Sequence, residues 1–161
     1  GTSHTNATAL IVAGGGGSHR SSYSASGYED KLDAVTTTSG VTTFYAGGTN
    51  GGGGIGNTST QWGGGSGAGF IGNGEGTGVS YSFRNGGVGA NYVYQNYGDQ
   101  EGGFGGGGSG GGGGYSGGGG GKNSSGISAQ GGGGGSYNSG SNEDNSAGAW
   151  EGHGKVTITK N

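Results

Sequence analysis

Glycine makes up 53 of the 161 residues, and much of it is arranged in unbroken runs. Glycine loses more conformational freedom on folding than any other residue, and it brings no side chain to a core. A chain of this kind can be ordered only if backbone N–H and C=O groups make most of the stabilising contacts. The runs at 105–108, 110–114, 117–121 and 131–135 lie close together in one part of the chain.

The rest of the composition supports this constraint. Glycine, serine, threonine and asparagine together account for 99 residues, whereas Leu, Ile, Val and Phe account for only 18, about 11% of the chain. An aliphatic and Phe content below roughly 20% is typical of disordered chains, but such chains usually carry a high net charge. This chain has a net charge of −3. We therefore expect an ordered fold without an ordinary hydrophobic core.

The absent residue types exclude several classes of protein. Without proline and without a Gly-X-Y period the chain is not a collagen. Without cysteine it has no disulfides, no thiolate nucleophile and no Cys-ligated metal site. The longest apolar run is 9–13, which predicts neither a membrane-inserted segment nor a signal peptide. Since Arg20 and Arg84 are the only arginines, a nucleic-acid partner is not expected.

Five short segments rich in β-branched or aromatic residues, bounded by glycine or polar turn residues, predict strands. We expect the first to be a buried strand, the next three to be half-buried antiparallel strands, and the last to place Val156 and Ile158 on one face. The only helix candidate, at 28–35, is very short. The five segments are 9–13, 41–45, 79–83, 91–94 and 155–159.

The block from Gly102 to Gly140 has no fixed period, so it is not a fibrous array. One interpretation is a flexible linker. The interpretation we favour is a bundle of polyglycine-II helices, which are left-handed extended helices rising about 3.1 Å per residue. Packed side by side, such helices exchange N–H···O=C bonds laterally, and only glycine lets the backbones approach closely enough. Turns are expected at 115–116, 122–130 and 137–150.

Several of these segments, in order along nearly the whole chain, resemble the glycine-rich extracellular domain of the anaplastic lymphoma kinase and leukocyte tyrosine kinase receptors. The resemblance implies an antiparallel tumour-necrosis-factor-like β-sandwich with an inserted bundle of glycine helices, in a unit that binds a protein cytokine at the cell surface. The matching segments are Ala9 to Ala13 with Gly14 to Gly17, Gly102-Gly103-Phe104, Gly114-Tyr115, Gly131 to Gly135 with Ser136-Tyr137, and Glu151 to Ile158.

Two features of the chain depart from those receptors. The receptor domains contain cysteines and this chain has none, and its loops between strands are shorter. Cytokine binding is therefore not carried over. The glycine-helix device is also similar to that of phage receptor-binding adhesins, whose tips use loops between such helices to grip host surfaces. Because a fold is inherited more reliably than a function, both kinds of protein stay open as models.

Motifs for catalysis and for cofactors fail on inspection. Gly117 to Gly121 with Lys122 is similar to a phosphate-binding loop, but the two defining end positions hold Ser116 and Asn123. The pair Glu143-Asp144 lacks the ligand spacing of a calcium loop and is better explained as a solvated turn. His153, between two glycines, is interpreted as a turn residue. We expect no enzymatic activity, no cofactor and no metal.

The aromatic residues are the best functional signal. Tyrosine supplies 9 of the 15 aromatics, in a Tyr, Ser, Gly and Asn background typical of antibody binding surfaces. A core role is favoured for the rings in predicted strands, which are Tyr81, Phe83, Tyr92 and Tyr94. Core and contact roles stay equally open for the rings beside turns or glycine runs, which are Tyr97, Tyr115 and Tyr137.

Two turn segments combine rings with carboxylates and amides, one entering the glycine block at 97–101 and one leaving it at 137–150. A ring stacked on a sugar, with carboxylates and amides bonding its hydroxyls, would form a glycan site. The same acidic groups would suit a basic protein, and the alternative is that both segments are solvated turns. The candidate ligand-binding residues are Tyr97, Asp99, Glu101, Tyr137, Asn142, Glu143, Asp144 and Trp150.

These observations predict one domain over 1–161, with strands and loops at 9–101 and 151–161 and the polyglycine-helix block at 102–140. We expect a mainly β, non-enzymatic binding domain at the cell or virion surface, in the adhesive tip of a bacterial or phage fibre. Its expected partner is a cell-surface glycan or protein, and a homotrimer is the assembly considered. The alternatives are a cytokine-binding module of a receptor ectodomain and a purely structural spacer.

Overall fold

The computed structural model describes residues 4–18, 31–58, 63–94, 98–108, 110–124, 127–141 and 143–148. Regular elements are few and short among them. In chain order they are β1 (Ile11–Val12), the 3-10 helix η2 (Phe83–Asn85), β2 (Asn91–Tyr94), β3 (Gly98–Glu101), β4 (Lys122–Ser124), β5 (Ile127–Ala129) and β6 (Tyr137–Asn138).

The strands form three separate two-stranded antiparallel sheets. β2 pairs with β3, and β4 with β5, each within a local hairpin, whereas β1 pairs with β6 from the far end of the described chain. In that last pair Val12 lies opposite Tyr137. The predicted strand at 91–94 is confirmed as β2, and the segment 155–159 lies outside the described residues. The tumour-necrosis-factor-like sandwich stays a prediction.

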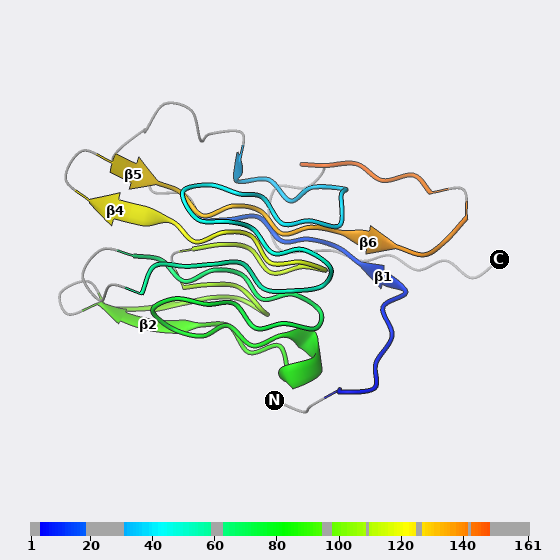
Figure 1. The fold of residues 1–161 in the computed structure, drawn as a ribbon, viewed down its shortest axis with the longest axis horizontal. Helices are drawn as coiled ribbons and strands as arrows, with labels where there is room; N and C mark the ends of the chain where they lie inside the picture. The colour runs from blue at the N-terminus through cyan, green and yellow to red at the C-terminus, as the bar shows by residue number, and fades with distance from the viewer. Residues whose placement is uncertain are drawn as a thin grey trace.

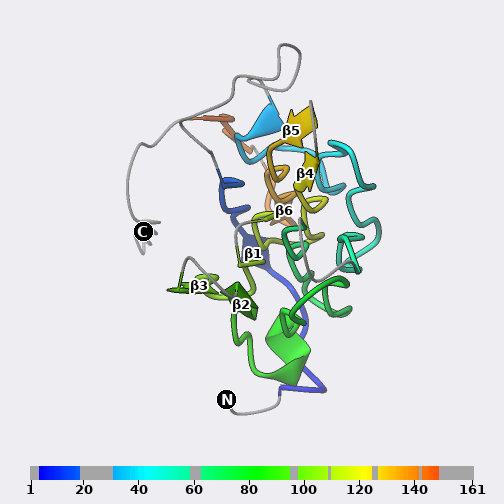
Figure 2. The same ribbon diagram turned by 90° about the vertical axis from the view of Figure 1, so that its left-hand side faces the viewer.

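Most of the described chain consists of extended segments without a regular element, running side by side along the long axis of the molecule (Figure 1). Figure 2, turned by 90°, shows that these segments are stacked in more than one layer. Besides the run 105–108 that precedes it, the segment 110–114 bonds to four neighbouring segments. Its bonds include Gly111 N–H to Gly65 O (3.0 Å), Gly112 N–H to Gly132 O (2.8 Å), Gly118 N–H to Gly112 O (2.9 Å) and Gly15 N–H to Gly113 O (2.8 Å).

This bonding pattern differs from that of a sheet. A flat strand bonds to at most two neighbours, one on each edge. The backbone of 110–114 therefore has to rotate between successive residues, so that its N–H and C=O groups point in different directions around the segment axis. An extended helix with three residues per turn would direct them in this way.

The segments approach so closely that side chains are excluded between them. A Cβ added at Gly112 would collide with the carbonyl oxygen of Gly15 and lie only 2.6 Å from that of Gly16. Real Cβ atoms essentially never come within 3.0 Å of such atoms. Gly103, at a turn, is different, because a Cβ there would meet no atom within 4 Å. The need for glycine is thus a property of the packed segments and not of every glycine.

Serine takes the place of aliphatic residues in the interior. Ser66, Ser80, Ser82 and Ser116 are the largest fully buried side chains among the described residues. Ser66 Oγ donates to Gly54 O (2.6 Å) and accepts from the Glu75 N–H (2.8 Å), and Ser80 Oγ donates to Ser66 O (2.8 Å). The Ser66 hydroxyl thus adds to a backbone bond already present, from the Glu75 N–H to Gly54 O (3.1 Å), and the Ser80 hydroxyl satisfies a further buried carbonyl.

Three strand predictions need correction. The segment 9–13 is not a buried strand: only Ile11 and Val12 are extended into β1, and Leu10 and Ile11 are 69% and 68% exposed. The segments 41–45 and 79–83 contain no strand, and Phe83 begins η2. The segments 41–45 and 79–83 bond mainly to closely packed glycine backbones, which leave no space for an aliphatic face, whereas 9–13 pairs only with the short strand β6. Of the helix candidate, residues 32–35 are not helical.

The segment 79–83 also reverses its predicted orientation. Its alternation is real, but Ser80 and Ser82 point inward, whereas Tyr81 is 44% exposed. The predicted core role of Tyr81 is therefore wrong. A serine fits beside the carbonyl of Ser66, where a phenol ring would not, so the side-chain size that the bundle tolerates decides which face is buried.

Candidate functional site

Aromatic rings from turns far apart in the sequence gather at the end of the molecule where η2 and β6 lie. His4, Phe83, Phe70, Tyr115 and Tyr137 form a continuous stack, which we call the ring row. The centroid distances and interplanar angles are 5.2 Å and 22° for His4–Phe83, 5.1 Å and 9° for Phe83–Phe70, 6.5 Å and 21° for Phe70–Tyr115, and 4.6 Å and 19° for Tyr115–Tyr137.

The centre of the ring row is structural. Phe70 is 6% exposed, and the guanidinium of Arg84 lies over its ring, 5.5 Å from the centroid. Nη2 of Arg84 donates to Ala7 O (2.7 Å), which ties the N-terminal segment to this end. Aromatic pairs contribute about 0.5–1.5 kcal/mol beyond area burial, so the row stabilises turns that glycine alone would leave loose.

Phe104 is the exposed member of this cluster. Its ring is tilted by 60° against Phe83, with a centroid distance of 6.2 Å, yet the residue is 71% exposed. The ring is seated on Gly87, because a Cβ at Gly87 would collide with the ring carbons of Phe104. Gly87 also has a φ of +66°, a conformation that side chains disfavour. The ring of Phe104 thus contacts Gly87 and Phe83 while most of the residue is exposed to solvent.

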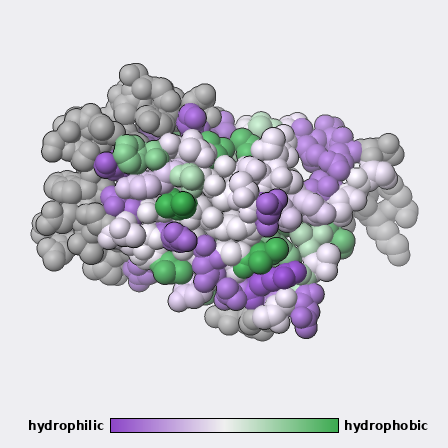
Figure 3. All heavy atoms as spheres, viewed as in Figure 1, coloured by the Kyte–Doolittle hydropathy of each residue, from purple (hydrophilic) through white to green (hydrophobic). Residues whose placement is uncertain are grey.

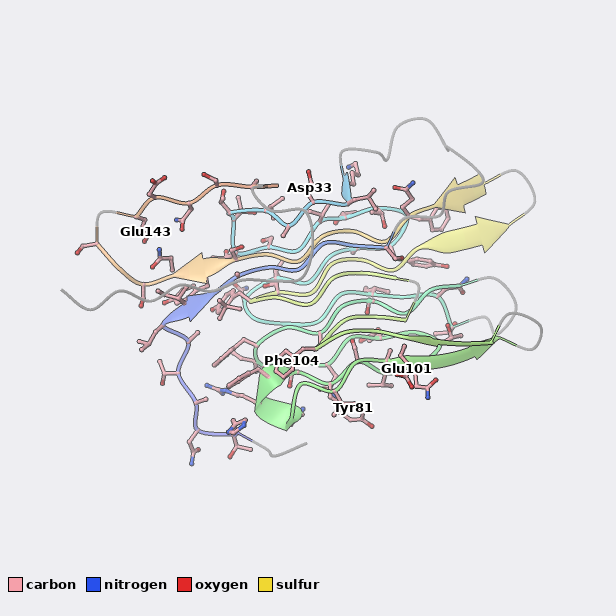
Figure 4. The ribbon with its side chains drawn as sticks, turned by 180° about the vertical axis from the view of Figure 1, so that it is seen from behind. Asp33, Tyr81, Glu101, Phe104 and Glu143 are labelled. Atoms are coloured by element: carbon pink, nitrogen blue, oxygen red, sulfur yellow. The ribbon has the colours of Figure 1, made fainter. Side chains whose placement is uncertain are left out.

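The chain segments around Phe104 are tied together laterally. Gly105 N–H donates to Gly87 O, and Tyr81 N–H donates to Val88 O, each at 2.8 Å. Figure 4 shows Phe104, Tyr81 and Glu101 along one edge of the molecule, with Tyr81 between the other two in this view. We call the exposed side chains of Phe104, Tyr81, Val88 and Glu101 the Phe104 surface.

The first predicted turn segment contributes one residue to this surface. Glu101 ends β3 opposite Asn91, and its side chain is exposed. Asp99 lies in β3 opposite Val93. Tyr97 lies outside the described residues.

The second predicted segment is placed elsewhere, and Figure 4 shows Glu143 well separated from Glu101. Tyr137 in β6 is half-buried, since its ring stacks on Tyr115. Glu143 and Asp144 are exposed, whereas Asn142 and Trp150 lie outside the described residues. The structure therefore does not bring the two predicted segments together.

The polar residues that follow Tyr137 form a short chain of hydrogen bonds. Asn138 Nδ2 donates to Asn145 Oδ1 (3.3 Å), and Asn145 Nδ2 donates to Glu143 Oε2 (2.8 Å). Successive side chains of a strand point to opposite faces, so Asn138 is directed away from the ring of Tyr137. The side chains of this turn thus bond to one another. Their amide and carboxylate groups are therefore partly occupied and less available to a ligand.

A second, smaller aromatic group lies at β4. The ring of Phe44 packs edge-on against Tyr45, and Lys122 Nζ lies 4.0 Å above the Phe44 centroid. The lysine covers the ring that it contacts, which makes this group less available to a partner than Phe104. On the face shown in Figure 3 the surface is mostly pale from small residues, with hydrophobic side chains in separate groups.

Among the described residues, no three His, Asp or Glu side chains are grouped to hold a metal ion. Within the same part of the chain, no helix has the length and apolar character needed to cross a membrane. No protein-family model, no curated protein and no solved structure matches the chain.

The exposure of Phe104 is not predicted by the local sequence pattern. The residue stands in Gly102-Gly103-Phe104, between glycines and outside any predicted strand. The available signal was its isolation: a large apolar residue flanked by glycines has no neighbours in sequence that could cover it. The contact between the Phe104 ring and Gly87 is not predictable from the sequence, because the two residues are 17 positions apart.

Proposed function

We propose that this chain is a non-enzymatic binding domain displayed outside the cell, in the adhesive tip of a bacterial or phage fibre. In this proposal, packed polyglycine-II helices form a rigid scaffold, and side chains at its turns and edges contact a cell-surface glycan or protein. The extracellular location follows the resemblance of the glycine segments to receptor ectodomains and to phage adhesins.

The scaffold part of the proposal is supported by the backbone bonding. The segment 110–114 bonds to four neighbouring segments besides the run 105–108, and a side chain at Gly112 has no space. A backbone held from several sides loses little further entropy when a ligand binds, which favours affinity. A flexible linker or spacer has no need of such bonding.

The observation that carries the binding role is the exposed ring of Phe104. Burying a phenylalanine side chain is worth about 1.5–3 kcal/mol, and here most of that is forgone although the ring row lies beside it. Rigid aromatic side chains at exposed positions are the usual anchors of binding surfaces. The Phe104 surface is therefore the proposed contact site.

The test is binding of the fluorescently labelled domain to a panel of bacterial and animal cells. We expect saturable binding to some cell types, and at least a tenfold loss in affinity for Phe104→Ala. Leu10→Ala is the matched control, since Leu10 is also apolar and 69% exposed but lies in another segment. Absence of binding to every cell type, or equal binding by Phe104→Ala, would refute the proposal.

A further inference from the structure

The surroundings of Phe104 restrict what can bind there. The flanking residues Gly102, Gly103 and Gly105 have no side chains, and a Cβ at Gly103 would meet nothing within 4 Å. A ligand lying flat on the ring can therefore extend over the exposed peptide of Gly103, whereas Gly105 on the other side is buried and bonds to Gly87 and Ala68. The ring packs against Gly87 and Phe83 on its covered side.

The same edge of the molecule offers a hydrogen-bond acceptor as well as further apolar side chains. Glu101 is exposed at the end of β3, three residues before Phe104, and Tyr81 and Val88 are about half-exposed. The complementary ligand has one flat apolar face and a rim of hydroxyl groups that donate to a carboxylate and to backbone carbonyls. A pyranose ring has this form, with C–H groups on one face and hydroxyls around the edge.

We infer that the ligand of the Phe104 surface is an oligosaccharide, with one pyranose ring stacked on Phe104 and a hydroxyl of another sugar donating to Glu101, which lies beyond Tyr81 (Figure 4). The inference rests on the proposed binding function and narrows its ligand class. A protein partner is less well matched, since the cores of protein interfaces are depleted in charged residues, whereas Glu101 is exposed on this surface. The carboxylate favours neutral over acidic sugars, because an acidic sugar would be repelled.

The first experiment separates glycan from protein on cells that bind the domain. Cells are treated with periodate, which cleaves vicinal diols of sugars, or with a broad-specificity protease, before labelled domain is added. We expect periodate to abolish binding and protease to leave most of it. Binding that survives periodate but is lost after protease treatment would overturn the saccharide inference and leave the binding function standing. Absence of binding to untreated cells of every type would instead refute the binding function.

The second experiment tests stacking with purified ligands, an array of neutral and acidic oligosaccharides. Phe104→Tyr keeps a flat ring and should bind within about threefold of the unaltered protein, whereas Phe104→Leu keeps an apolar side chain without a face and should bind at least tenfold more weakly. Glu101→Gln should weaken binding severalfold. Thermal melting checks that each variant is folded. Equal binding by the Leu and Tyr variants, or no binding to any saccharide, would overturn the inference.

Discussion

The ring of Phe104 rests on Gly87, in the space that a Cβ at Gly87 would occupy. The contact joins a turn of the glycine block to a turn that follows η2, and it fixes the orientation of the most exposed aromatic side chain in the described part of the chain. Gly87 thus acts on the candidate site without presenting any functional group of its own.

A double-mutant cycle tests this contact. Gly87→Ala should destabilise the protein both through strain at φ +66°, about 1 kcal/mol, and through displacement of the ring. In a Phe104→Ala background only the strain remains, so the cost should fall by roughly 1 kcal/mol. Denaturant unfolding of the four proteins gives the coupling free energy. Equal costs in the two backgrounds would mean that ring and glycine do not interact.

Close packing of the glycine segments predicts a contrast between two glycines. Gly112→Val should lower stability by about 3 kcal/mol or more, because the new side chain would enter the space held by Gly15 and Gly16. Gly103→Val, facing open space, should change stability by about 0.5 kcal/mol or less. The melting temperatures of the two variants check this. An unchanged melting temperature for Gly112→Val would contradict the packing.

The hydrogen bonds of the buried serines predict that removing a buried hydroxyl lowers the stability of the protein. Ser66→Ala removes a buried donor to Gly54 O and one of the two acceptors of the Glu75 N–H, the other being Gly54 O, and should cost about 0.5–1.5 kcal/mol. Ser39→Ala, at an exposed position, serves as the control and should be close to neutral. If denaturant unfolding shows equal stabilities for both variants, the serine hydroxyls do not hold the segments together.

How much of this structure could be predicted depends on which side chains the glycine backbone admits. The runs themselves predicted a fold held by its backbone, and the aromatic alternation at 91–94 predicted β2. The same alternation at 79–83 failed, since Ser80 is buried and Tyr81 exposed, opposite to what hydrophobicity favours. Local pattern rules assume a neighbouring surface with space for large residues, and that assumption does not hold beside glycine segments.

The candidate site was less predictable than the fold. The ring row joins residues as distant as His4 and Tyr137, and only the folding of successive turns to the same end brings them together. Of the predicted site residues, Tyr137 became part of this stack, and Glu101 lies on the Phe104 surface. The sequence pointed to aromatic and acidic residues at turns as candidate ligand-binding residues. It carried no information about which turns lie together in the fold.

The turn residues proposed from the sequence keep a test of their own. If these turn residues and not the Phe104 surface formed the contact site, Tyr97→Ala and Asp144→Ala would each weaken cell binding by at least tenfold, about 1.4 kcal/mol, without a change in melting temperature. Asp144 is exposed, so its removal leaves no cavity. Titration of labelled variants on cells checks the prediction. Full binding by the double variant would exclude these two turns and leave the Phe104 surface as the site.

Amide hydrogen exchange over Gly105 to Gly121 tests most directly whether backbone bonds between glycine segments order this protein. The N–H groups of Gly111, Gly112 and Gly118 each donate to another segment, so their exchange requires the segments to separate. We predict exchange many orders of magnitude slower than in an unstructured chain, with the amide of Gly103 as a faster internal reference. Exchange at unprotected rates throughout 105–121 would contradict the account.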